Sequence, residues 1–137
     1  MAVLLALDPG ERRTGIAMSD PEGIVASPLT THDRQRDRSL IDLVERLCSE
    51  HEVSEVVVGH AITQDGTRGG SARRSERVAE LLTARLRSRN VTVRLVDERY
   101  STAEAQRILA GRRRPREHRD AVAAALILQA VLDARRA

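Results

Sequence analysis

The stretch LLALDPGERRTGIAMSD, residues 4–20, decides the fold. An apolar run over residues 2–8 ends on Asp8, a short turn follows, and a second apolar run covers residues 14–18. A continuous apolar run of this length is typical of a strand that is buried on both faces. The short turn predicts that the second strand returns antiparallel to the first. A carboxylate at the end of a buried strand needs a partner, so the other acids of the chain become informative.

The remaining elements complete a mixed sheet. Residues 24–31 form the predicted third strand, after a turn that contains Pro21, and residues 54–59 and 91–97 form two more. Helices are predicted over residues 36–50, 73–87, 102–109 and 115–135, and residues 60–71 read as a loop. Helical crossovers require strands one, four and five to be parallel neighbours. We therefore expect an α/β fold in which a five-stranded sheet, antiparallel over its first three strands, is flanked by helices.

Composition narrows the class of protein. A chain of 137 residues with 41 % hydrophobic residues is expected to fold as a single domain, residues 1–137, with its own core. Tyr100 is the only aromatic residue, which argues against a protein that stacks bases on aromatic rings. The lone Cys48 forms no disulfide framework and fits a reducing cytoplasm. No apolar stretch reaches the ~18 residues of a membrane span.

All 23 basic residues are arginine, although the net charge is only +3. A codon bias toward arginine would explain the absence of lysine but not the clustering. Arginine forks bind phosphate bidentately, so the clusters are candidate nucleic-acid contacts. The segment 112–119 is either a solvated start of the last helix or a row of phosphate contacts that position nucleic acid without reading its sequence. The candidate nucleic-acid-binding residues are Arg12, Arg13, Arg73, Arg74, Arg112, Arg113, Arg114 and Arg116.

Acids stand at three unusual places. Asp8 ends the first strand, and Asp97 and Glu98 end the fifth. Asp120 is interior to a helix that begins near Pro115, on the apolar stripe formed by Ala124, Ile127, Leu128 and Val131. Each acid also has an ordinary interpretation: Asp8 as a turn cap, Asp97 as a partner of Arg99, and Asp120 as a partner of Arg116 or Arg119 or as the cap of a shorter helix.

Taken together, the acids predict a metal site. Parallel strands one and five and a helix packed on the sheet can bring them to one end of the molecule, where carboxylates repel unless cations lie between them. Mg²⁺ suits such a site because it prefers oxygen ligands from a few carboxylates and from substrate phosphate. Two such ions ~4 Å apart would activate a water and stabilise the leaving oxygen in phosphodiester hydrolysis. The small side chains of residues 123–125 are expected to let the helix approach the sheet closely.

Five segments in order, LALDPGERRTGIAMSD, GIVASPL, VVVG, LVDERYST and RDAVAAALILQAVLD, resemble the successive motifs of the YqgF (RuvX) family. The resemblance covers almost the whole chain and implies a ribonuclease H-like fold related to Holliday-junction resolvases. It implies a nuclease that matures the end of the small-subunit (16S) ribosomal RNA precursor, or, in an older assignment, resolves branched DNA. Asp8, Glu98 and Asp120 would be its catalytic, metal-binding acids, with Asp97 in reserve, and Mg²⁺ or Mn²⁺ its cofactor. The expected partner is pre-rRNA or branched DNA, and the expected setting is ribosome assembly in the cytoplasm. The protein would act as a monomer or a homodimer.

The chain departs from this pattern after the fourth strand. His60 and Ala61 follow Gly59, where relatives usually carry Leu-Pro. His60 reads either as a surface-loop histidine or as a proton shuttle. Three other functions compete with the nuclease. An actin- or sugar-kinase-like ATPase needs two such domains, and the chain is too short for them. A nucleic-acid-binding module with a decayed site conflicts with acids at all three positions, and the third alternative is a structural scaffold in ribosome assembly.

Overall fold

A computed structural model describes residues 2–33, 37–60, 70–97 and 116–136. Its sheet has five strands in the order β3-β2-β1-β4-β5. The strand β1 pairs antiparallel with β2, which pairs antiparallel with β3, while β4 runs parallel to both β1 and β5. The bounds are Val3–Pro9 for β1, Arg13–Ser19 for β2, Ala26–Asp33 for β3, Val53–His60 for β4 and Thr92–Asp97 for β5. The predicted mixed sheet is therefore confirmed, including its parallel neighbours.

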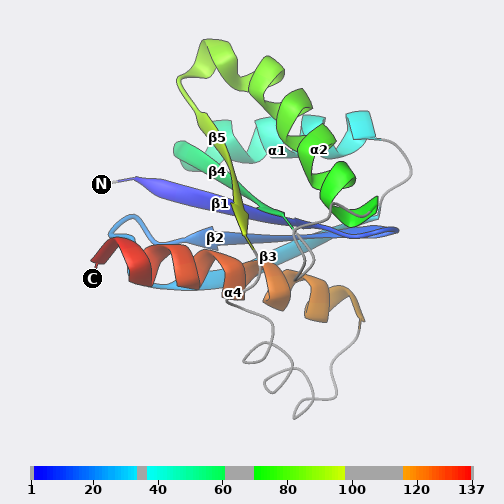
Figure 1. The fold of residues 1–137 in the computed structure, drawn as a ribbon. Coiled ribbons are helices and arrows are strands. Elements are labelled where there is room, and N and C mark those ends of the chain that lie inside the picture. Colours follow the sequence, from blue (N-terminus) through cyan, green and yellow to red (C-terminus); the bar gives the residue numbers. More distant parts are fainter. Residues whose placement is uncertain (1, 34–36, 61–69, 98–115, 137) are drawn as a thin grey trace.

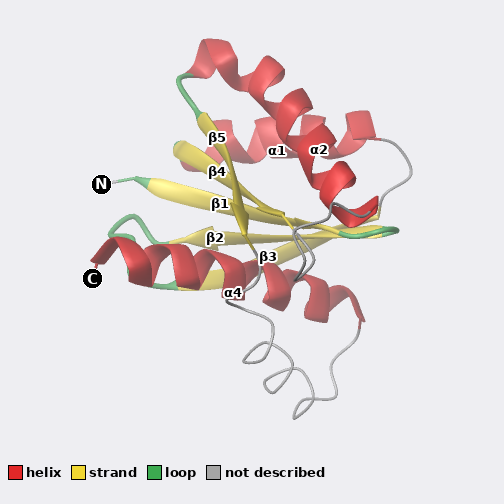
Figure 2. Ribbon diagram, in the orientation of Figure 1, coloured by secondary structure: helices red, strands yellow, loops and turns green. Residues whose placement is uncertain are grey.

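Helices cover both faces of the sheet (Figure 1). The helices α1 (Asp37–His51) and α2 (Gly70–Leu86) lie on one face, and α4 (Arg116–Arg136) lies across the other. Figure 2 shows the same three layers coloured by secondary structure. A short 3₁₀ turn, η1 (Arg87–Arg89), leads from α2 toward β5. No helix in the described part of the chain has the length and apolarity to cross a membrane.

Strand alternation divides the core into two parts. Leu5 and Leu7 of β1 point to the α1 and α2 side, where they join the buried faces of those helices. Leu4 and Ala6 point to the other side, where they pack against Ala124 and other small and aliphatic residues of α4. The parity of a residue in β1 therefore tells which helices its side chain meets.

Several predicted element boundaries were wrong, and the largest shift is at α2, which begins at Gly70 inside the predicted 60–71 loop rather than at residue 73. The third strand begins at Ala26 rather than at residue 24, because the Asp20 carboxylate accepts the backbone N–H groups of Ile24 and Val25 at 2.7 and 2.9 Å and extends the turn. His60, predicted as the first residue of a loop, is instead the last residue of β4, where its register partner is Asp97. The predicted helix over residues 102–109 lies outside the described residues.

The end of α4 that is remote from Asp120 is tied to the turn between β2 and β3. The Gln129 amide accepts the backbone N–H of Ala26 at 2.9 Å and donates to the carbonyl of Ile24 at 2.8 Å. The Arg136 guanidinium donates to the carbonyls of Gly23 and Ile24. These contacts fix how α4 crosses the sheet.

Candidate active site

Asp8 lies on the α4 side of the sheet. It has the parity of Leu4 and Ala6, which pack against α4, and it is half-buried near the carboxyl end of β1. Its partner in the antiparallel β2 is Gly15. Directly opposed residues of an antiparallel pair share a face, so Gly15 also faces α4.

The backbone of α4 touches the sheet at Gly15. A Cβ atom built on Gly15 would overlap the carbonyl oxygen of Asp120 and would stand 2.9 Å from the backbone nitrogen of Ala121. Helix and strand can approach this closely only because residue 15 has no side chain. Since Gly15 is also the partner of Asp8, the approach brings Asp120 beside Asp8, although 112 positions separate them in sequence.

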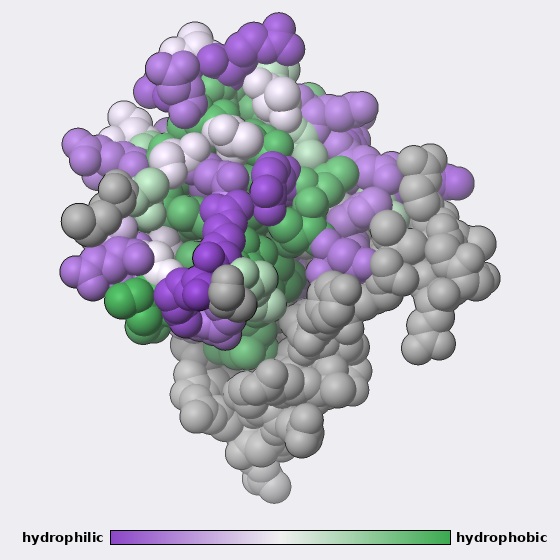
Figure 3. All heavy atoms as spheres, turned by 60° about the vertical axis from the view of Figure 1, so that its left-hand side comes forward, coloured by the Kyte–Doolittle hydropathy of each residue, from purple (hydrophilic) through white to green (hydrophobic). Residues whose placement is uncertain are grey.

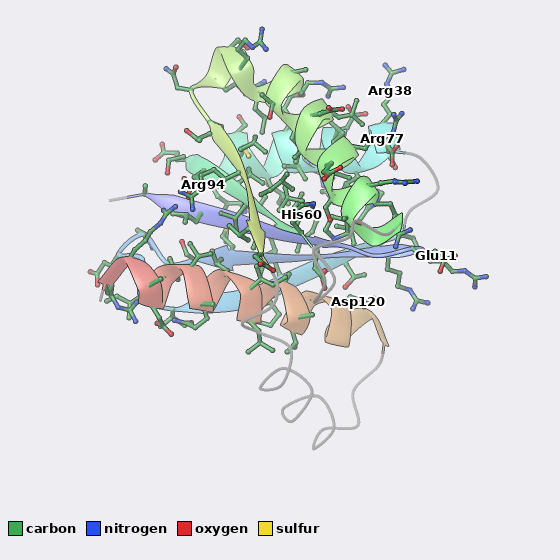
Figure 4. The ribbon with its side chains drawn as sticks, in the orientation of Figure 1. Glu11, Arg38, His60, Arg77, Arg94 and Asp120 are labelled. Atoms are coloured by element: carbon green, nitrogen blue, oxygen red, sulfur yellow. The ribbon has the colours of Figure 1, made fainter. Side chains whose placement is uncertain are left out.

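Asp120 is inside α4 rather than at its end. The helix begins at Arg116, so Asp120 lies in the second turn and is not its N-cap. It is half-buried, and Ala124 and Leu128, one and two turns further on, are fully buried against the sheet. The predicted apolar stripe is therefore present, with Asp120 at its end (Figure 4).

Side chains alternate between the two faces of the sheet along β5, so the consecutive acids at its end have opposite parity. Val96 packs with the α4 side of the core, whereas Val93 packs with the α1 and α2 side. Asp97 has the parity of Val93, and its register partner His60 shares that side. By strand parity the reserve candidate Asp97 belongs to the face opposite Asp8 and Asp120, although, as the last residue of β5, it also borders the space between β5 and α4. Glu98 lies outside the described residues.

His60 is held by α2. Its Nε2 atom is 3.0 Å from Oε2 of Glu76, and the side chains are only 13 % and 25 % exposed. The interpretation as a surface-loop histidine is therefore wrong, because His60 is the last residue of β4 and its ring is covered by α2. In Figure 4, His60 and Asp120 lie on opposite sides of the sheet.

The candidate phosphate-binding arginines are only partly described. Arg12 and Arg73 are exposed. Arg13 lies 3.6 Å from the Asp33 carboxylate of β3, and the Nε atom of Arg74 is buried without a hydrogen-bond partner among the described residues. The residues Arg112, Arg113 and Arg114 and the side chain of Arg116 lie outside the described part of the structure.

The described acids have the chemistry of a divalent-cation site. Asp8 and Asp120 offer carboxylate oxygens from a rigid strand and a rigid helix, and hard ions such as Mg²⁺ prefer oxygen ligands. Among the residues described, no group of three His, Cys, Asp or Glu side chains could hold a metal ion. The two acids fit a metal site that would take further ligands from substrate, water or other parts of the chain.

Gly15 is the functional position that the sequence analysis missed. From the sequence, the small side chains of residues 123–125 were expected to allow the close approach of the last helix, and Ala124 and Ala125 are indeed buried. The tightest approach, however, is made by the strand glycine. The available signal was a glycine inside an otherwise apolar strand, a position that often marks close approach of another backbone.

Comparison with known proteins identifies the family. The family model described as "RuvX: Holliday junction resolvase" matches residues 2–134. The chain belongs to the RuvX family. The family expected from the sequence motifs is thus confirmed. Its description as a resolvase is that of a nuclease.

Relatives of this RuvX chain match over almost its whole length. The protein of Thermosynechococcus vestitus named "Putative pre-16S rRNA nuclease" is 42 % identical over 139 residues, covering 98 % of this chain and 90 % of the relative. The protein of Myxococcus xanthus with the same name is 40 % identical over 136 residues, covering 96 % of this chain and 88 % of the relative.

Solved structures confirm the fold class of the RuvX chain. The RuvC protein of Thermus thermophilus, solved in complex with a Holliday junction substrate, superposes with a TM-score of 0.66 at 16 % identity and covers 99 % of this chain and 96 % of its own. The fowlpox virus resolvase, solved with its substrate Holliday junction DNA, has a TM-score of 0.63 at 8 % identity, covering 97 % and 98 %. The ribonuclease H-like architecture is therefore shared with these resolvases.

Proposed function

We propose that this RuvX chain is a metal-dependent nuclease that hydrolyses a phosphodiester bond at the end of the precursor of 16S ribosomal RNA. The observation that carries the proposal is the juxtaposition of Asp8 and Asp120 at Gly15. The relatives named as pre-16S rRNA nucleases support the choice of substrate. We place this activity in the cytoplasm, during ribosome assembly.

Asp8 and Asp120 would hold Mg²⁺ or Mn²⁺, and Glu98 is proposed as the third acid. An ion bound there would neutralise charge that develops on the phosphate and favour ionisation of the attacking water. The parity of β5 supports Glu98 over Asp97, since side chains alternate along a strand and Asp97 has the parity of Val93 on the other face. The protein's own contribution is to hold Asp8 and Asp120 in fixed positions before substrate arrives.

Arginines would position the substrate around these acids. Arg12 on the turn between β1 and β2 and Arg73 near the start of α2 are exposed. Arg112, Arg113 and Arg114 come just before α4 in the sequence, and Arg116 is the first residue of this helix, which carries Asp120. Contacts of this kind bind phosphate without reading sequence.

The test is cleavage of three matched substrates: a precursor of 16S rRNA, single-stranded DNA and a four-way DNA junction. Each is incubated with Mg²⁺, Mn²⁺ or a chelator, using wild type and the variants Asp8→Asn and Asp120→Asn. We expect cleavage of the precursor RNA that needs the metal and is lost in both variants, while both still fold and bind RNA. Cleavage by Asp8→Asn at the wild-type rate would overturn the site.

The family description favours a second candidate, resolution of branched DNA. In the same experiment, preferential and symmetric cutting of the four-way junction would select this activity over RNA maturation. Binding of all substrates with no metal-dependent cleavage would select the binding module with a decayed site.

A further inference from the structure

A groove runs between β5 and α4 on the same face of the sheet as Asp8 and Asp120. Its cavity is about 280 Å³, and five of its eight lining residues are apolar. Its apolar lining includes Val96 of β5 and Ile127 and Val131 of α4. In Figure 3, which brings the left-hand side of Figure 1 forward, a band of hydrophobic residues is exposed between hydrophilic ones. A volume at the small end of ligand pockets suits a single flat group rather than a protein segment.

The groove begins near the proposed catalytic acids. Asp97 lines it at the carboxyl end of β5, and Ile127 lies seven residues after Asp120 on α4. At a rise of 1.5 Å per residue this separation is about 10 Å along the helix axis. When the bond to be cleaved lies at the acids, a neighbouring nucleotide of the same strand can therefore lie in the groove. The reacting atoms themselves are too far away to enter it.

The far end of the groove carries positive charge. Arg94 of β5 and Arg135 of α4 line it, and both approach the carboxylate of Glu55 in β4, at 4.0 and 2.6 Å. The Glu55 side chain is 15 % exposed, whereas those of Arg94 and Arg135 are 49 % and 41 % exposed. Two guanidinium groups against one carboxylate leave one net positive charge. Each guanidinium has five N–H donors, so most remain available to a phosphate.

We propose that this groove, named here the β5–α4 groove, binds one unpaired nucleotide of the substrate strand next to the cleaved bond. The base would lie on Val96, Ile127 and Val131, and the adjoining phosphate would contact Arg94 and Arg135. The inference rests on the proposed nuclease function and adds a requirement for single-stranded nucleic acid beside the cleavage point. An apolar slot without base-edge partners accepts any base, so the groove selects single strand over duplex rather than one sequence.

The test measures binding, in chelator, of a fluorescein-labelled RNA hairpin that carries a short single-stranded tail. The same hairpin is also prepared with one abasic residue at each tail position in turn. The variant Ala130→Trp fills the groove from an exposed position of α4 that lines it, and Ala84→Trp, exposed on α2 and outside the groove, is its size-matched control. Arg94→Gln and Arg46→Gln form a second pair that removes the same charge inside and outside the groove. Thermal unfolding of each variant verifies that it folds, and Ala134→Trp replaces Ala130→Trp if that variant does not.

We expect wild type to lose about tenfold in affinity when the abasic residue occupies one particular tail position, and little at the others. Ala130→Trp should show a similar loss with the intact tail and no further loss with that abasic tail. Arg94→Gln should weaken binding more than Arg46→Gln. Equal affinity of wild type for all tails, additive losses, or no binding of the hairpin would overturn the inference. This binding assay does not depend on cleavage. If wild type shows the groove effects here but no metal-dependent cleavage in the three-substrate experiment, the nuclease function is refuted and the groove inference is not.

Discussion

Replacing Gly15 by alanine is the sharpest perturbation of the site that the structure offers. The added methyl group would overlap the carbonyl of Asp120 and press on the nitrogen of Ala121, 2.9 Å away. These are backbone atoms of a regular helix and cannot rotate aside, so α4 must move away from β2. Overpacking of this kind costs about 1–3 kcal/mol and occasionally more, and we expect the upper value here because the obstacle is backbone.

The expected result is a loss of about 3 kcal/mol in the free energy of unfolding. At this chain length that corresponds to a fall of about 10 °C in melting temperature, measured by calorimetry or circular dichroism. Cleavage of precursor RNA below the melting transition should fall about 100-fold, because a displacement near 1 Å separates Asp120 from Asp8.

Gly70→Ala is the matched control. Gly70 opens α2, and a Cβ there meets only the flexible end of the Arg74 side chain at 3.9 Å. This variant should melt at or slightly above the wild-type temperature, since alanine favours helix over glycine. Wild-type melting and cleavage in Gly15→Ala would refute the close approach of α4 and, with it, the pairing of Asp8 with Asp120.

Three further outcomes are expected. Burial lowers the pKa of His32 below 6.5 despite the nearby Asp33 carboxylate, so the folded state favours the neutral ring. The stability that neutral His32 contributes is therefore present above pH 6.5 and is lost as the pH falls through the folded-state pKa. Denaturant titrations from pH 7.5 to 5 should show this loss of stability in wild type and a smaller loss in His32→Gln. Burial also raises the pKa of Cys48 to about 11, so a thiol reagent at pH 8 should label it only on unfolding; labelling of the native protein within mixing time contradicts its buried position. Replacing Arg112, Arg113 and Arg114 by glutamine should weaken RNA binding and flatten its dependence on salt, and an unchanged slope in a salt titration rules out phosphate contacts there.

The sequence predicted the sheet because its signals were local and unambiguous. The apolar runs ending at Asp8 and at Asp97 read as strands, and the helices between strands one, four and five required parallel neighbours. It also predicted that Asp120 lies on a helical face with Ala124 and Leu128, since a helix repeats every 3.6 residues.

Other features depend on contacts between distant segments and could not be read from the chain. The close approach of Gly15 to the backbone at Asp120 depends on where α4 crosses the sheet, which Gln129 and Arg136 fix at the other end of the helix. The side chain of His60 is largely covered because Glu76 of α2 pairs with it, and no local sequence pattern predicts that pair. The pairing of Arg94 and Arg135 with Glu55 joins three elements that are remote in sequence.

The central claim is that Asp8 and Asp120 together bind a divalent cation. The most direct measurement is anomalous diffraction from a crystal of the protein soaked in Mn²⁺. We predict a manganese peak within metal–oxygen bonding distance of both carboxylates, and its disappearance in crystals of Asp8→Asn. A well-ordered site with no manganese at saturating concentration, or manganese bound only elsewhere, would contradict the account.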